Sequence, residues 1–221
     1  MTIVKRQKEL HHAVSVIGGF FAAYTVMNHC DILANAQTGN LIRLVVNACR
    51  GDLGSIGFMV LGFLVYAAGN VFYAVARKYL KLSMKIVSFI VTAAAIVLTG
   101  LLSGVGNHYL AVLPVVFYAP VQWNAYKSAG GNSSSTIFSS NNVRQAVMLL
   151  TKYVMEKDDK AGKNARFYWA TLLWFHIGAV FAGVLSLVLG AQSVWLCFLP
   201  LGVAVYFYYR YQTAKINAFA K

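Results

Sequence analysis

Acidic residues are scarce in this sequence. Only 6 Asp and Glu stand against 19 Lys and Arg, and charged residues make up 11% of the 221 positions. A soluble domain carries about 25% charged residues. No acid lies within a long apolar run, which excludes a carboxylate relay inside a hydrocarbon core. Together with 59% hydrophobic residues and a mean hydropathy of +0.61, this composition predicts an integral membrane protein.

Motifs for catalysis and metal binding are also missing. The 3 cysteines show no CxxC or Cys/His ligand spacing, and no P-loop, HExxH or GxSxG pattern is present. We therefore expect no enzyme activity, no metal and no cofactor. The cysteines are interpreted as packing residues. The alternative, a Cys30–Cys49 disulfide, requires that both face an oxidising exterior.

The net charge of +13 would suggest a nucleic-acid partner in a soluble chain. Here the basic residues lie between apolar runs, which is the pattern that controls topology and contacts anionic lipid. The expected partners are therefore membrane lipids and a small polar or anionic solute, without nucleic acid.

Six stretches approach the length of about 20 apolar residues that a helix needs to cross a bilayer. They are residues 13–30, 53–76, 86–106, 109–126, 167–190 and 193–209. Two further segments, 37–50 and 136–157, are too polar to cross comfortably. In the second, apolar residues form one helical stripe, which predicts an amphipathic helix at the interface or dipping partly into the membrane.

The basic residues predict the orientation. With a cytoplasmic N-terminus, every Lys and Arg except Arg43 and Arg50 falls on the cytoplasmic side of the predicted spans. Such a bias places both termini in the cytoplasm. The expected location is the inner membrane of a bacterium.

One short pattern occurs twice. Ala23-Tyr24 ends the first apolar stretch and is followed, 17 residues after Ala23, by Asn40; Ala125-Tyr126 is followed at the same spacing by Asn142. We therefore divide the chain into two membrane repeats, residues 1–106 and 107–221. Three spans in each repeat place the second copy upside down in the bilayer. The predicted fold is an all-α membrane protein with six transmembrane helices, built as two inverted three-helix repeats, each with an extra short polar helix.

The residues around this pattern resemble a known family. The segments GGFFAAY at 18–24, AQTGNL at 36–41 and QWNA at 122–125 resemble the YoaK family of bacterial inner-membrane proteins. The resemblance implies a six-span membrane protein of undefined, transport-like function. Two positions depart from the family pattern: Ala22 replaces a frequent acid, and Ser140-Asn141-Asn142 replaces a second Thr-Gly-Asn. Proton coupling through a carboxylate at position 22 is thus unavailable.

The candidate substrate-binding residues are the polar groups of the duplicated segments and of the spans. They are Thr38, Asn40, Arg43, Gln122, Asn124, Ser140, Asn142, Arg144 and His176. Amides present donors and acceptors to a solute without a buried charge, and helix N-termini attract anions. Each group has an alternative: amides hold helices together, and Ser, Thr and Asn cap them.

His176 lies near the middle of the fifth stretch, where it would bind substrate or relay a proton. The alternative is a neutral imidazole bonded to a neighbouring helix. Small-xxx-small patterns at Gly100/Gly104 and Gly178/Ala182 permit close helix packing within the chain or in a homodimer.

These observations predict a small transporter or facilitator for a polar solute, working by alternating access between the two repeats. Two alternatives stay open. One is a substrate-binding membrane subunit of an ATP-driven uptake complex. The other is a membrane scaffold or sensor without flux.

Overall fold

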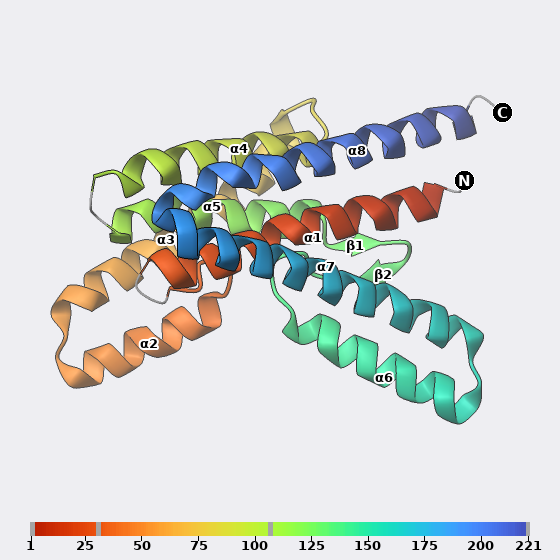
Figure 1. Ribbon diagram of the computed structural model, residues 1–221, viewed down its shortest axis with the longest axis horizontal. Coiled ribbons are helices and arrows are strands. Elements are labelled where there is room, and N and C mark those ends of the chain that lie inside the picture. Colours follow the sequence, from red (N-terminus) through yellow and green to blue (C-terminus); the bar gives the residue numbers. More distant parts are fainter. Residues whose placement is uncertain (1–2, 30–31, 106–107, 220–221) are drawn as a thin grey trace.

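The protein folds into helices that run along one long axis (Figure 1). The structure is a computed structural model that describes residues 3–29, 32–105 and 108–219. The helices are α1 (Ile3–Asn28), α2 (Gln37–Arg50), α3 (Leu53–Tyr79), α4 (Met84–Ser103), α5 (His108–Ala125), α6 (Ser140–Glu156), α7 (Asp159–Leu189), the 3-10 helix η1 (Gly190–Cys197) and α8 (Phe198–Phe219). The all-α prediction is confirmed.

Within residues 3–29, 32–105 and 108–219, four helical stretches are long and apolar enough to cross a membrane by length and composition. They are Ile3–Asn28, Ile56–Tyr79, Met84–Ser103 and Asp159–Ala218. The last contains α7, η1 and α8, and Figure 1 shows α8 running back in the opposite direction to α7, with α1 between them. The helix α5 contains Pro114 and Pro120 and is not among the four. The predicted ends at Cys30 and Gly106, and the Cys30 partner of the suggested disulfide, lie outside the described residues.

The helix α1 forms the centre of the molecule. Its most apolar window is 72% buried, against 11% for α3 and 22% for the stretch that holds α7 and α8. It packs against α7 and α8, whereas α5 packs against α3 and α4. Three glycines allow these helices to approach closely. A Cβ added to Gly19 of α1 would meet the backbone of α7, and one added to Gly178 of α7 would meet the backbone of α1. A Cβ added to Gly69 of α3 would meet α5.

Two shorter helices form hairpins with the long helix that follows each. The helix α2 packs on α3, and α6 packs on α7. Figure 1 shows that α2 runs from the middle of the molecule towards one end and α6 from the middle towards the other. Both keep apolar side chains exposed, including Ile42, Val45, Val147 and Met148. This agrees with the amphipathic helix predicted for residues 136–157, and α2 has the same character although its segment was predicted only to be polar.

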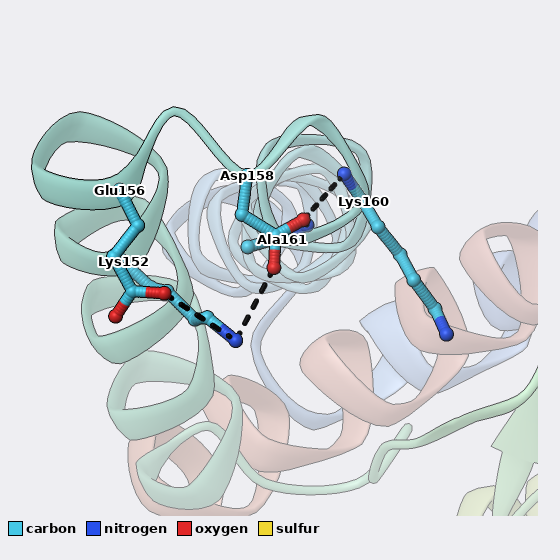
Figure 2. A network of polar contacts seen from close by, with 5 residues as sticks. All are labelled: Lys152, Glu156, Asp158, Lys160 and Ala161. Carbon is cyan, nitrogen blue, oxygen red and sulfur yellow. Dashed lines mark hydrogen bonds and ion pairs between the residues drawn. The ribbon is translucent and has the colours of Figure 1, made fainter.

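The turn into α7 is held by Asp158. Its carboxylate accepts hydrogen bonds from Lys160 N and Ala161 N at 2.9 and 3.0 Å, and Lys152 Nζ lies 3.2 Å from the carboxylate (Figure 2). The bond from Ala161 and the ammonium of Lys152 lower the pKa of Asp158. At neutral pH the Asp158 carboxylate is therefore ionised and caps α7. The cap weakens only when acid protonates this carboxylate.

A small hairpin separates α5 from α6. Strands β1 (Ser128–Ala129) and β2 (Asn132–Ser133) pair antiparallel. The turn residues Gly130 and Gly131 have φ of 58° and 82°, the conformation of a two-residue hairpin turn. Gly130 N donates to Gln7 Oε1 of α1 at 3.1 Å, so the hairpin is tied to the first helix. The sequence analysis did not predict this hairpin, and α6 consequently starts at residue 140 instead of 136.

Candidate functional site

A polar cavity of about 340 Å³ lies where α3 and α5 meet the segment that leads into α6. Its lining residues come from both predicted halves: Asn70, Trp123, Asn124, Lys127, Ser133, Ser134, Ser135, Phe138 and Asn141. Trp123 and Phe138 form an edge-to-face pair with ring centroids 4.9 Å apart. The cavity thus combines an aromatic wall with amides, hydroxyls and one ammonium group.

Asn70 and Asn124 link α3 to α5 beside this cavity. Asn124 Nδ2 donates to Asn70 Oδ1 at 3.0 Å and to the carbonyl of Pro120 at 2.8 Å, while Asn70 Nδ2 donates to Tyr66 O at 3.1 Å. Because a carbonyl accepts only, the Pro120 contact fixes which amide atom of Asn124 is the nitrogen. Among the described residues no donor reaches Asn124 Oδ1, which is left as an acceptor for a solute.

Lys127 supplies the positive charge of the cavity. It is exposed, and no acid in the described part of the chain forms an ion pair with it. Its own carbonyl accepts from Ser134 N at 3.1 Å, which fixes the backbone at the cavity edge. An unpaired ammonium beside amides and hydroxyls suits a carboxylate or phosphate group.

Asn142 is buried behind the cavity and organises the segment before α6. Its Nδ2 donates to Ser135 O at 2.7 Å, and its Oδ1 accepts from Ser134 Oγ at 2.9 Å and Ser135 N at 3.4 Å. The side chain is 2% exposed. Neither α2 nor α6 has a side-chain cap at its N-terminus, so Asn142 holds the preceding loop and does not cap its helix.

Asn40 makes the matching contact in the first half. Its Nδ2 donates to the carbonyl of Leu33 at 3.4 Å, and the separation of seven residues is the same as for Asn142 and Ser135. Asn40 is only half-buried, and α2 has no buried residue. The duplicated asparagines therefore share one local contact in two different environments.

Gln122 lies in the core and does not line the cavity. It is 1% exposed, accepts from the Tyr118 hydroxyl, and its Nε2 donates to Thr136 Oγ1 at 3.1 Å and Val14 O at 3.3 Å. These bonds join α5, α1 and the segment before α6. The alternative role of an amide, holding helices together, describes this residue.

The structure does not bring the remaining predicted residues to the cavity. Thr38 and Arg43 are exposed on α2, and Ser140 and Arg144 are exposed at the start of α6. Arg144 donates to Asn141 Oδ1 at 3.4 Å and is thereby one residue removed from the lining.

His176 is exposed on α7. Its Nδ1 lies 2.8 Å from Leu172 O of its own helix, and its ring borders an apolar hollow on the outer side of α7. His176 does not line the cavity, and within the part of the chain that the structure describes it makes no hydrogen bond to a neighbouring helix. Neither interpretation of this residue from the sequence describes its position.

At the opposite end of α1, Tyr24 joins several elements in a second buried polar cluster. Its hydroxyl donates to Ala191 O of η1 at 2.8 Å and lies 3.1 Å from His29 Nε2 and 3.3 Å from Ser103 Oγ of α4. Nearby, Asn28 Nδ2 donates to Ser186 Oγ of α7 at 2.9 Å. This cluster connects α1, α4, α7 and η1 and leaves this end of α1 tightly packed.

Sequence reasoning missed most of the cavity lining. The sequence identifies Asn70 as a polar residue on a predicted span. Its pairing with Asn124 cannot be predicted without the contact between α3 and α5. Lys127 was counted only for topology. Ser133, Ser134 and Ser135 lie in a Gly/Ser/Asn-rich stretch, and that composition is equally typical of a plain loop.

Apolar helices long enough to span a membrane, enclosing a polar cavity, are consistent with a helical membrane protein. The chain belongs to a family described as "Protein of unknown function (DUF1275)", whose model matches residues 10–207. No curated protein and no solved structure matches the chain.

Proposed function

We propose that the protein is a small secondary transporter or facilitator for a small polar or anionic solute. In this proposal it resides in a bacterial inner membrane as a YoaK-like protein with six spans and both termini in the cytoplasm. Its two halves are inverted repeats that alternate access to a shared site.

Six spans follow if α7 and α8 each cross the membrane and α5 crosses beside α3 and α4. The antiparallel course of α7 and α8 supports the first condition (Figure 1). For the second, α5 has 18 residues, close to the usual minimum for a span. Figure 1 also shows N and C at the same end of the molecule, as an even number of spans requires.

The packing pattern supports inverted repeats. The first helix of each half packs against the last two long helices of the other half: α1 on α7 and α8, and α5 on α3 and α4. The short helices α2 and α6 occupy equivalent hairpins and extend to opposite ends (Figure 1). The matching contacts of Asn40 and Asn142 extend this correspondence to single hydrogen bonds.

The cavity carries the functional proposal. Polar groups are costly at membrane depth unless they serve packing or function, and this site has an open acceptor and an unpaired ammonium. Its volume of about 340 Å³ fits a small metabolite. Lys127 favours a solute with a negative group, and Asn124 favours one that also has a donor.

Access from the two ends differs. The cavity lies by the hairpin and the start of α6, whereas the other end of α1 is filled by the Tyr24 cluster. In an alternating-access cycle, each state opens the site to one side of the membrane and closes it to the other. An open cavity at one end and a packed cluster at the other fit the state in which the site faces the side of the termini.

The test is uptake into proteoliposomes from a mixed panel of carboxylates, phosphates and amino acids, with the lumenal contents measured by mass spectrometry. We expect at least one compound to enter faster than into protein-free liposomes. Asn124→Ala and Lys127→Gln should reduce its flux about tenfold or more, since each removes a contact to the solute. Lys163→Gln, a basic residue of α7 outside the cavity, is the matched control.

Two outcomes contradict the proposal. If every compound enters protein-containing and empty liposomes at the same rate, the protein does not transport these compounds. Binding of a compound without such flux would favour the alternative, a subunit of an ATP-driven uptake complex. Unchanged flux in both variants would remove the cavity from the transport path.

A further inference from the structure

His11 is a buried histidine of α1 that directly contacts the segment lining the cavity. Its side chain is 1% exposed, and its Nε2 lies 3.0 Å from Ser134 Oγ. Ser134 lines the cavity and also bonds to Asn142. A chain of three side chains thus runs from the first helix of the first half to the start of α6 in the second half.

The hydrogen-bond pattern fixes the proton on His11. Asn142 Nδ2 donates to a carbonyl, so its Oδ1 is the atom that faces Ser134, and an amide oxygen only accepts. The Ser134 hydroxyl therefore gives its hydrogen to Asn142 and accepts from His11 Nε2–H. The other ring nitrogen, Nδ1, then carries a lone pair, and it is buried without a partner among the described residues.

The surroundings of His11 are apolar and basic. The ring packs on Phe167 of α7 with centroids 5.4 Å apart, and the basic groups near it are His12 of α1 and Lys85 of α4. Lys85 is itself close to the charge of Lys215 from α8.

Among the described residues, the other titratable groups near His11 offer no unpaired carboxylate. Lys8 lies over the Phe167 ring at 5.2 Å, and the carboxylate of Glu9 is paired with Arg6 at 2.8 Å. From α7, the Tyr168 hydroxyl donates to Ser133 O at 2.7 Å. A second proton on His11 would create a buried cation with no acceptor, which this arrangement does not accommodate.

We propose that His11 is the proton-binding site that couples proton movement to the transport cycle, acting on the cavity through Ser134 and Asn142. This inference rests on the proposed function. A hydronium ion from the aqueous phase gives its proton to the lone pair of Nδ1 and leaves a water molecule, and no bond of the protein breaks. The resulting imidazolium favours a conformation in which α1 and the segment from Ser134 to Asn142 separate.

The test measures the distance between α1 and α6 as the pH changes, without any solute. Spin labels are placed on cysteines at the exposed positions Lys5 and Met148, in a background of Cys30→Ser and Cys49→Ser, with the full chain in lipid nanodiscs. We expect a longer-distance population to grow roughly threefold or more between about pH 8 and pH 5, because a histidine that reaches water in the separated conformation takes up its proton in this range.

His11→Gln should abolish this response, because glutamine keeps a donor to Ser134 and does not take up a proton in this range. His176→Gln is the matched control: that histidine is exposed on α7 and does not line the cavity, so its variant should respond like the parent. If His11→Gln does not fold, Ser134→Ala is used instead. It keeps the histidine, removes its link to Asn142 and should likewise lose the response.

A distance distribution that ignores pH in the parent, or an equal response in His11→Gln, would overturn the role of His11. That result would leave uptake into proteoliposomes untouched. Conversely, an intact pH response with no flux of any panel compound would refute transport and leave the proton-driven movement standing.

Discussion

At the residue scale, two asparagines at one repeated position show how burial determines the contribution of a side chain to the free energy of unfolding. Asn142 has three hydrogen-bond partners and is 2% exposed, whereas Asn40 is half-buried and makes one bond of 3.4 Å. Their spacing in the sequence is the same, so the sequence predicts equal importance. The structure predicts unequal importance.

Asn142→Ala should lower the free energy of unfolding by about 2–3 kcal/mol, because it leaves the hydroxyl hydrogen of Ser134 and the backbone N–H and carbonyl of Ser135 buried without a partner. Asn40→Ala should cost less than about 0.5 kcal/mol, since water replaces its single contact. Thermal unfolding in detergent measures both. Equal losses in the two variants would show that the loop before α6 is not held by Asn142.

His176 shows the limit of reading single residues. Hydropathy placed it near the middle of an apolar stretch, and it does lie within α7. Which face of that helix points inward depends on α1, which packs against Gly178 and the residues around it. Periodicity did not resolve this, because α7 is apolar around most of its circumference. The buried histidines His11 and His29 lie in α1 and just after it, and the sequence analysis did not single them out.

At the element scale, contact between α1 and α7 depends on small residues. A Cβ at Gly178 would lie 2.0 Å from Val16 O, and one at Gly19 would lie 1.7 Å from Phe175 O. These contacts assign the small-xxx-small residues around Gly178 to packing within the chain. Gly100 likewise faces the Trp195 ring of η1. The homodimer remains a prediction that these glycines do not require.

Gly178→Ala should destabilise the protein by about 1–3 kcal/mol, because the added methyl group meets backbone that cannot rotate away. Gly202→Ala is the control on α8, where nothing lies within 4 Å of the added Cβ. There alanine should be neutral or slightly stabilising, since it favours the helix. Thermal unfolding of both variants checks this, and equal melting temperatures would refute tight packing of α1 on α7.

Element boundaries were predictable where the chain itself marks them. The start and end of α2 match the predicted polar segment at residues 37–50. The start of α6 was missed because residues 128–133 form a hairpin, whose two glycines only show their positive φ in the structure. The helix α1 begins at residue 3, earlier than the apolar run, because its polar first turns are covered by α7 and the hairpin.

At the scale of the whole molecule, the sequence predicts helices and a polar site between two halves, but not which residues line the cavity. Composition and periodicity determine how apolar each helix is. They do not determine that Asn70 of α3 meets Asn124 of α5, or that Lys127 and the serines of the next segment close the same space. Those contacts depend on long-range packing, for which a single sequence carries no direct signal.

The central claim is that the two halves cross the membrane in opposite senses, and the ends of α2 and α6 test it most directly. Cys49 is an exposed native cysteine near the end of α2, and Lys157 is exposed directly after α6. The measurement is labelling with a membrane-impermeant thiol reagent in intact and permeabilised bacterial cells. It compares a Cys30→Ser protein, which keeps Cys49, with a Cys30→Ser/Cys49→Ser protein that carries Lys157→Cys or Lys215→Cys.

The account predicts that Cys49 reacts in intact cells, whereas the cysteines at positions 157 and 215 react only after permeabilisation. Reaction of positions 49 and 157 from the same face of the membrane would contradict the inverted arrangement, and with it the shared, alternately accessible site.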